Sequence, residues 1–333
     1  MAWAESSCII FDMNPADTVK RKAIDLGFDL VGITDAAAID AGHIESFENW
    51  LRAGFAGQMG YMHRNLGERF NPTALFEGAH SVVVVALNYK PSEISDDAVK
   101  VDKYTGRIAH YARYVDYHIF IKSLLRQLAD FITSEIDEQA RFKLCVDSVP
   151  LAERALAQRA GLGFIGKNRM LINTQLGPEI LLGELITTAQ LETDKPVEQN
   201  CEKCNKCVEA CPTGALRADG RFDAAKCISY LTIEHAGDIK PSLAHNMNDQ
   251  LFGCDKCILA CPYYYKAPVC TNKHFKYYPQ NSYLNLETIL AMTEDDFDNR
   301  FRNSPIHRSG LDMLKRNTQI CLDNIVGFPA GAG

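Results

Sequence analysis

The sequence predicts three consecutive parts, an α/β domain, a small cysteine-rich domain of the ferredoxin type and a short helical segment, at residues 1–195, 196–270 and 271–333. Two observations predict this arrangement. Helical and strand periodicities alternate through the first part of the chain. Eight of the twelve cysteines then fall between Cys201 and Cys261, after a polar linker at residues 190–200.

The elements of the first part follow from the apolar pattern. Apolar residues at Val19, Ala23, Ile24 and Leu26 predict a helix within residues 15–30 that Gly27 ends. The continuous apolar run at 81–89 predicts a central strand covered on both faces. The same reasoning predicts further strands at 28–34, 142–147 and 179–188 and further helices at 45–53, 119–131 and 148–161.

Two polar segments of the first part have both a structural and a functional interpretation. The stretch 57–72 is a surface loop, or a lid whose Arg64 and Arg69 anchor an acidic or amide-rich ligand. The stretch 106–118 is the edge of a helix, or a pocket wall that uses His110, Arg113, Tyr114 and Tyr117.

Asp147 ends a predicted strand and faces the start of a predicted helix, a place where α/β sheets tend to hold ligands. A lone aspartate before a helix is more often a simple N-terminal cap. The glycine-rich turn 161–168 can bring backbone N–H groups close to a cofactor. It has no dinucleotide fingerprint, and Lys167 is followed by Asn168 rather than by the Ser or Thr of a P-loop.

The cysteine spacing is the strongest signal in the chain. Two Cys-x-x-Cys runs each end in Cys-x-x-x-Cys-Pro, the pattern in which thiolates hold 4Fe-4S clusters and the last cysteine reaches the other cluster. The spacing predicts one cluster on Cys201, Cys204, Cys207 and Cys261 and a second on Cys211, Cys227, Cys254 and Cys257. Two clusters form an electron relay, so another group must receive the electrons.

Zinc ribbons and disulfides explain the cysteines less well. Zinc ribbons use paired Cys-x-x-Cys knuckles without the two Cys-Pro endings. Disulfides are rare in chains without a secretory signal, and the opening residues lack the basic start of one. The remaining cysteines are expected to be buried small hydrophobic residues: Cys8, Cys145, Cys270 and Cys321.

Composition limits the classes of partner. No apolar run approaches the roughly 20 residues that span a bilayer, so we expect a cytoplasmic protein that does not associate with a membrane. The net charge of −7 gives no overall indication of nucleic acid. Basic residues among aromatic ones at 263–280, and a basic run at 300–317, are either RNA contacts or locally packed and paired segments. No dimerisation stripe is evident, so we expect a monomer.

Most of the chain, from about residue 15 to 320, resembles the epoxyqueuosine reductase family. The cysteine set alone is shared with many ferredoxin-like proteins. The resemblance is more specific because further blocks occur in order: GYMHRN, RFNP, SVVVVALNY, GRIAHYARYVDYH, VDSVPLAERALAQRAGLGFIGKN, LGELITT, RFDAAKCISYLTIEH, LFGCDKCILACP and RNSPIHRSG.

The resemblance implies a cobalamin-binding first domain and reductive removal of the epoxide oxygen from epoxyqueuosine at the wobble position of a tRNA with a GUN anticodon. It implies that Asp147 donates the proton, for which burial should raise its pKa. An unidentified low-potential donor would supply the electrons, and the final segment would contact tRNA. The corrin contacts would be Arg64, Arg69, Asp147, Gly166, Lys167, Asn168, Cys254 and Asp255.

Two other functions compete with this one. A corrinoid reductive dehalogenase also joins a cobalamin domain to two clusters, but the VDSVPLAER block and the absence of an export signal argue against it. A non-catalytic electron carrier explains the clusters but leaves the first 195 or so residues without a role. A pure RNA-binding module needs no electron relay.

Overall fold

The computed structural model describes residues 14–92 and 104–327. Its larger sheet has four strands in the order β1-β2-β7-β4, and every neighbouring pair is antiparallel. The strands are β1 (Leu30–Asp35), β2 (Ser81–Asn88), β7 (Ile180–Thr187) and β4 (Phe142–Cys145). The rule that places ligands at the carboxyl ends of parallel strands therefore does not explain the position of Asp147. The turn that contains Asp147 explains it instead.

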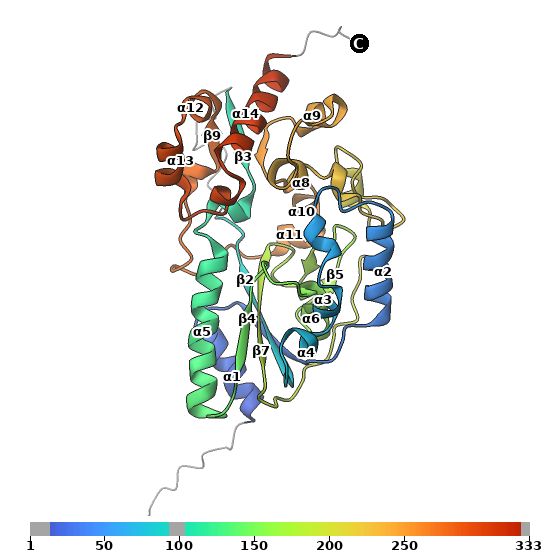
Figure 1. Ribbon diagram of the computed structural model, residues 1–333, viewed down its shortest axis with the longest axis vertical. Coiled ribbons are helices and arrows are strands. Elements are labelled where there is room, and N and C mark those ends of the chain that lie inside the picture. Colours follow the sequence, from blue (N-terminus) through green and yellow to red (C-terminus); the bar gives the residue numbers. More distant parts are fainter. Residues whose placement is uncertain (1–13, 93–103, 328–333) are drawn as a thin grey trace, which may run out of the picture.

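Helices cover both faces of this sheet (Figure 1). Val83, Val85 and Leu87 of β2 pack against α1 (Pro15–Asp25) and α5 (Tyr117–Glu135). The alternate residues of the strand pack on the side of α6 (Glu153–Arg159) and α2 (Ala41–Arg52). All of β2 is buried, which confirms the predicted central strand.

A second, three-stranded sheet joins distant parts of the chain. β3 (Thr105–Ile108) lies between β8 (Gln250–Phe252) and β9 (Tyr283–Asn285). Its core contains Ile108 and Phe252 from these strands. Each of the three parts predicted from the sequence thus contributes one strand. The boundaries at residues 195 and 270 stay a prediction, and the parts they separate share a hydrophobic core.

Short helices fill several segments that the sequence presented as loops. The stretch 57–72 was expected to be a surface loop; it contains η1 (Gly60–His63) and α3 (Leu66–Phe70), and α4 (Pro72–Leu75) follows. Phe70 is buried against Phe47 of α2, which explains why this segment is ordered. The glycine-rich turn forms a hairpin of β5 (Phe164–Ile165) and β6 (Leu171–Ile172).

The cysteine-rich part and the final segment are mostly short helices, as predicted for the C-terminal end. The remaining elements are η2 (His110–Arg113), α7 (Lys206–Glu209), η3 (Ala224–Lys226), α8 (Ile228–Ile233), α9 (Pro241–Met247), α10 (Lys256–Leu259), α11 (Pro262–Lys266), η4 (Pro279–Asn281), α12 (Leu286–Ala291), α13 (Glu294–Phe301), η5 (Pro305–Ser309) and α14 (Leu311–Val326). Within residues 14–92 and 104–327, no helix is long and apolar enough to cross a membrane.

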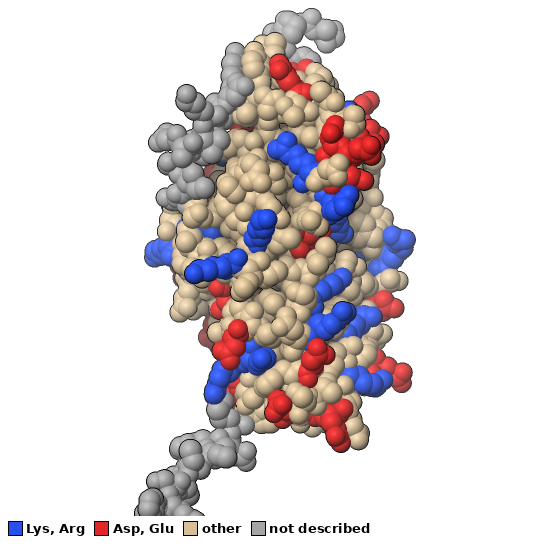
Figure 2. All heavy atoms as spheres, turned by 90° about the vertical axis from the view of Figure 1, so that its left-hand side faces the viewer, with Lys and Arg blue, Asp and Glu red and all other residues tan. Residues whose placement is uncertain are grey.

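Charges of both signs are interspersed on the face that carries α5 (Figure 2). In the basic run 300–317, His307 makes a local ion pair and Arg316 makes hydrogen bonds to a distant segment. His307 pairs with Asp298 at 2.8 Å, and Arg316 donates to backbone carbonyls of Leu231 and Gly237. Much of this run is therefore engaged within the protein.

Candidate functional site

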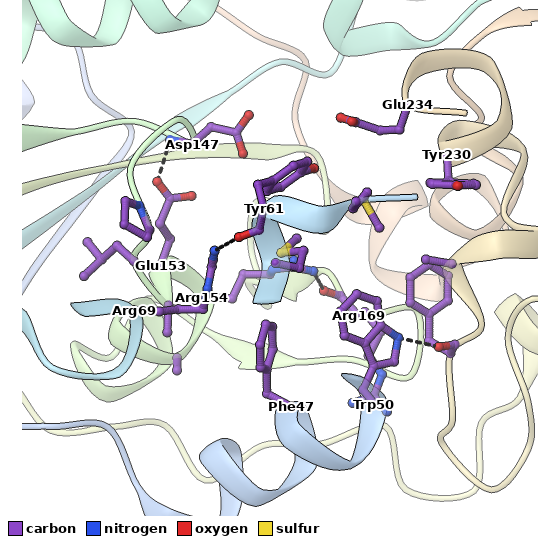
Figure 3. A pocket seen from close by; sticks show the side chains of 18 of the residues that line it. Phe47, Trp50, Tyr61, Arg69, Asp147, Glu153, Arg154, Arg169, Tyr230 and Glu234 are labelled. Atoms are coloured by element: carbon purple, nitrogen blue, oxygen red, sulfur yellow. Dashed lines mark hydrogen bonds between the residues drawn. The ribbon is translucent and has the colours of Figure 1, made fainter. Parts of the chain in front are cut away.

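A cavity of about 1560 Å³ lies where the α/β part meets the cysteine-rich part. Its wall combines α2, η1, α3, the turn after β4, the start of α6 and residues around α8. Figure 3 shows aromatic and cationic side chains, among them Trp50, Tyr61 and Arg169, around this space. Drug-sized ligands occupy roughly 300–1,000 Å³. The cavity is therefore large enough for a bulky cofactor together with a second molecule.

Asp147 projects into this cavity from a strained turn. Its φ is 54°, and the N–H of Ser148 donates to the carbonyl of Val146. This three-residue turn with positive φ at its centre is the rarer and more strained kind of γ-turn. The helix starts only at Glu153, with Ala152 as its N-cap, so Asp147 is not the helix cap and the helix predicted from residue 148 begins later.

Three groups surround the Asp147 carboxylate. The Tyr117 hydroxyl donates to it at 2.9 Å, His118 Nε2 lies 3.3 Å away, and Arg308 Nη1 lies 4.0 Å away. On its other side, His118 Nδ1 is 2.7 Å from Asp116 Oδ1. The segment after β4, the start of α5 and η5 thus bring four charged groups to one end of the cavity.

These contacts decide where the proton lies. Burial raises the pKa of Asp147, but hydrogen bonds from His118 and Tyr117 and the Arg308 charge outweigh it, and the net pKa lies below the ordinary value. Burial and the Arg308 charge lower the pKa of His118, but the Asp116 and Asp147 carboxylates outweigh them and raise the net pKa. In the protein alone the pKa of Asp147 is therefore lowered, and the raised pKa expected beneath a bound corrin stays a prediction.

Electrostatic contacts among the cysteine thiols support the two sets that their spacing predicts. Burial raises the pKa of Cys207, and the thiols of Cys201, Cys204 and Cys261 raise it further, so these four lie together. In the same way Cys254 is affected by Cys227 and Cys211, and Cys257 by Cys227 and Cys254. Groups of four thiols are the donor sets that cubane clusters need. The individual ligand assignments stay a prediction.

Five predicted corrin contacts do not line the large cavity: Gly166, Lys167, Asn168, Cys254 and Asp255. Lys167 instead supports the first cysteine loop. Its ammonium donates to the carbonyls of Glu202 and Cys204 and to Asn205 Oδ1 at 3.1, 2.9 and 2.8 Å. With Asn168 it lines a smaller cavity of about 340 Å³ around the first set of cysteines.

Two other residues of these five, Asn168 and Asp255, make hydrogen bonds within the protein. The Asn168 side chain accepts a hydrogen bond from the N–H of Met170. Asp255 is buried and accepts the N–H of His110 at 2.8 Å. Contact of these five residues with a corrin stays a prediction, and in the protein alone they lie outside the lining of the large cavity.

Arg64 and Arg69 do line the large cavity, as predicted. Arg69 stacks on the ring of Phe47, with 5.5 Å between its guanidinium carbon and the ring centroid. Its buried Nε atom has no hydrogen-bond partner. An unpaired buried donor is costly, so an acceptor group of a ligand in this cavity would satisfy it.

Of the four residues named for the pocket wall in the stretch 106–118, Tyr117 lines the large cavity, and Tyr111 and His118 of the same stretch line it too. His110 is buried with its Nδ1 2.7 Å from Glu179 Oε1. Arg113 donates to the carbonyl of Ile108. Tyr114 stacks on Phe275 at 4.6 Å between ring centroids. His110, Arg113 and Tyr114 therefore make contacts within the protein outside the large cavity.

In the stretch 263–280 most aromatic side chains are at least partly buried, whereas Lys266, Lys273 and Lys276 are exposed. Tyr263 contacts Phe164 edge-on, and Tyr264 lies under the ammonium of Lys90 at 4.4 Å. Tyr265 is the exception, with 73% of its surface exposed. The interpretation as a partly buried aromatic loop therefore describes most of this segment.

Comparison with known proteins agrees with this geometry. The family model "Epoxyqueuosine reductase QueG, DUF1730" matches residues 69–148, which include the Asp147 turn. The model "4Fe-4S double cluster binding domain" matches residues 200–264. Epoxyqueuosine reductase of Vibrio cholerae serotype O1 is 34% identical over 309 residues, which are 93% of this chain and 83% of that protein. The chain belongs to the epoxyqueuosine reductase family.

Solved structures of epoxyqueuosine reductases share the fold. One, determined with a tRNA-Tyr epoxyqueuosine-modified tRNA stem loop, has a TM-score of 0.86, 30% identity and coverage of 93% of this chain and 81% of that chain. Another, from Bacillus subtilis, has a TM-score of 0.85, 28% identity and the same coverages, and is described with an aspartate catalytic loop swung out of the active site. The α/β part followed by a double-cluster domain is thus the architecture of this family.

Sequence reasoning missed three members of the site within the epoxyqueuosine reductase fold. His118 and Arg308 reach Asp147 from segments 29 and 161 residues away in sequence, so no local pattern connects them. Glu153 accepts the Asp147 N–H at 2.6 Å, which only the turn geometry reveals. The quoted blocks GRIAHYARYVDYH and RNSPIHRSG contain His118 and Arg308, and this was the available signal.

Proposed function

We propose that this protein reduces epoxyqueuosine to queuosine at the wobble position of tRNA, with electrons passing through two 4Fe-4S clusters to cobalamin and with Asp147 delivering a proton. Removal of the epoxide oxygen takes two electrons and two protons and releases water. The observation that carries the proposal is Asp147, the one aspartate among the described residues that line the large cavity of a reductase of this family.

The arrangement of the cysteines supports a direction of electron flow. Cys227 of the second set lines the large cavity, whereas Cys201, Cys204 and Cys207 of the first set line the smaller one. The second cluster therefore borders the reaction space, and the first cluster is the entry point for electrons. A low-potential donor has to approach on the side of the first cluster.

The large cavity has the size that a corrin needs, and it contains a buried N–H donor, Arg69 Nε, that has no partner in the protein. Arg69, with its unsatisfied Nε, and Arg64 are the cations that would hold the amide-rich rim of cobalamin. Cobalamin, when bound, supplies the low-potential two-electron chemistry that removes the epoxide oxygen. The protein excludes water with aromatic walls such as Phe47 and Trp50.

The proton path runs through Asp147 and His118. His118 Nε2 donates to Asp147 only when it carries a proton, and it can accept from Arg308 Nη1 at 2.5 Å once that proton is gone. Tyr117 and Arg308 keep the Asp147 carboxylate oriented into the cavity. Asp147 then passes the proton of the imidazolium to the leaving oxygen.

The substrate is proposed from the relative that was solved with a modified tRNA stem loop. The modified base has to enter the large cavity beside Asp147, so the tRNA lies across its mouth. We further propose that residues 271–333 contact tRNA, that the protein is cytoplasmic and that it is a monomer.

Replacing Asp147 by Asn tests the proposal. The variant should bind iron and cobalt like the wild type after anaerobic cobalamin loading, because no cysteine changes. Its single-turnover rate on epoxyqueuosine tRNA should fall about 10²–10⁴-fold, the usual contribution of a general acid. A wild-type rate would remove Asp147 from the mechanism. Iron without cobalt in the wild-type protein would leave an electron carrier as the better account.

A further inference from the structure

Two carboxyl groups lie behind Asp147 that the proposed chemistry does not use. Glu153 begins α6, and Glu184 lies on β7 opposite Cys145 of β4. Glu184 is completely buried, and its side-chain oxygens have no hydrogen-bond partner other than the Glu153 carboxyl, which a Glu184 carboxylate could not satisfy without a proton. A buried carboxylate without partners is unfavourable, so Glu184 holds a proton.

Glu153 contacts the catalytic turn directly. Its Oε1 accepts the N–H of Asp147 at 2.6 Å, the contact drawn between the two residues in Figure 3. Asp147 occupies a positive φ that side chains other than glycine rarely adopt. A strained backbone persists only where its surroundings hold it, and a hydrogen bond to a charged acceptor is stronger than one to a neutral acceptor.

The groups around this pair decide its charge. Burial raises the pKa of Glu153, and Asp147 raises it further, while the Asp147 N–H, Glu184 and Arg154 lower it. Burial raises the pKa of Glu184, and Glu153 and Asp147 add to it. The other facing ionisable groups are Arg69 of α3, Tyr117 of α5 and Cys145 of β4. These neighbours together favour the state in which the Glu153–Glu184 pair carries one proton and one negative charge.

We propose that Glu153 is a positioning residue that holds the Asp147 turn in its catalytic shape, and that the buried Glu184 keeps one proton on the carboxyl pair so that Glu153 can do so. The role of Asp147 itself rests on the proposed function. Loss of the shared proton places two carboxylates next to Asp147, and their repulsion opens the turn.

Amide hydrogen–deuterium exchange at Asp147 tests the hydrogen bond without any turnover. In Glu153→Gln the protection factor of this amide should fall about tenfold, because a neutral acceptor replaces a charged one. Glu135→Gln, an exposed change on α5, is the control and should keep wild-type protection. Thermal unfolding shows whether each variant is folded. Wild-type protection of Asp147 in a folded Glu153→Gln protein would overturn the proposal.

The pH dependence tests the role of Glu184. Both carboxyl groups have raised pKa values, so protection of the Asp147 amide should be greatest where the pair carries one proton. It should weaken at lower pH, where Glu153 becomes neutral, and decline at higher pH, where the pair loses its last proton. Glu184→Gln and Glu184→Leu should both keep the protection and remove its alkaline decline. A decline that persists in both variants would show that Glu184 has no part in the turn.

Turnover separates this inference from the proposed function. If the wild type reduces epoxyqueuosine tRNA, Glu153→Gln should lower the single-turnover rate more than it changes the KM for tRNA, since Glu153 acts through the backbone N–H of Asp147. If the wild type does not reduce this tRNA, the proposed function fails, and the exchange measurements still decide whether Glu153 and Glu184 hold the turn.

Discussion

At the scale of single residues, the contacts of Asp147 and His118 lower the pKa of the carboxyl group and raise the pKa of the imidazole. The Asp147 carboxylate accepts from Tyr117 and faces His118 and Arg308, which stabilises its charged form. His118 is held between two carboxylates, which stabilises the imidazolium. The sequence suggests a buried acid with a raised pKa, but the contacts that reverse this shift come from α5 and η5.

His118→Gln should therefore change the pH profile. The pKa of His118 is raised above its ordinary value of 6.5, so the imidazolium is present below that pH and is lost as pH rises through the raised value. The wild-type single-turnover rate should decline over the same alkaline range. The variant should be about 10–100-fold slower near pH 7 and should lack this decline.

Stopped-flow measurement of single turnover between pH 6 and pH 9 checks this prediction. His245→Gln, which changes an exposed histidine on α9, is the control and should follow the wild-type profile. An unchanged alkaline decline in His118→Gln would assign the proton to another group.

At the scale of elements, the position of α6 against the sheet fixes the catalytic turn. Gly32 of β1 lies against the end of this helix, and a Cβ placed there would be 2.1 Å from the Ala160 carbonyl oxygen. The close approach leaves no room for a side chain. This close packing places Glu153, at the start of α6, within hydrogen-bonding distance of Asp147.

Gly32→Ala should push α6 away from the sheet and destabilise the protein by about 1–3 kcal/mol, the usual cost of overpacking. Gly42→Ala is a matched control, because nothing lies within 4 Å of a Cβ on this helical glycine of α2. It should stabilise the protein by roughly 0.5–1 kcal/mol. Urea unfolding measures both. Equal stability of the two variants would contradict the close approach.

Elements with a strong local pattern were predictable from the sequence, and long-range pairings were not. The apolar run 81–89 and the helix 119–131 appear as β2 and α5. The cysteine spacing predicted a double-cluster domain, which the family model over residues 200–264 confirms. β3, in contrast, is four residues whose partners lie about 145 and 180 residues later, and no local signal marks it. The support that Lys167 gives to the first cysteine loop was not predicted for the same reason, since Cys204 and Asn205 are its partners only in three dimensions.

At the scale of the whole molecule, the final segment is part of a shared core rather than an attachment. Leu284 of β9, Leu286 of α12 and Leu314 of α14 are buried with Ile108 and Phe252. Asn317 of α14 also donates to the carbonyls of Thr232 and Leu251. The cavity wall around Phe252 and Arg308 depends on this packing.

A chain that ends at residue 270 should therefore not fold cooperatively, although the sequence places a boundary there. It exposes Ile108, Leu251 and Phe252, and burial of each such side chain contributes about 1.5–3 kcal/mol against a total stability of about 5–15 kcal/mol. Circular dichroism melting and exchange at β3 measure the effect, with a chain ending at residue 327 as the control that should melt like the full chain. A soluble 1–270 protein with a sharp transition and protected β3 amides would instead make residues 271–333 a separate domain.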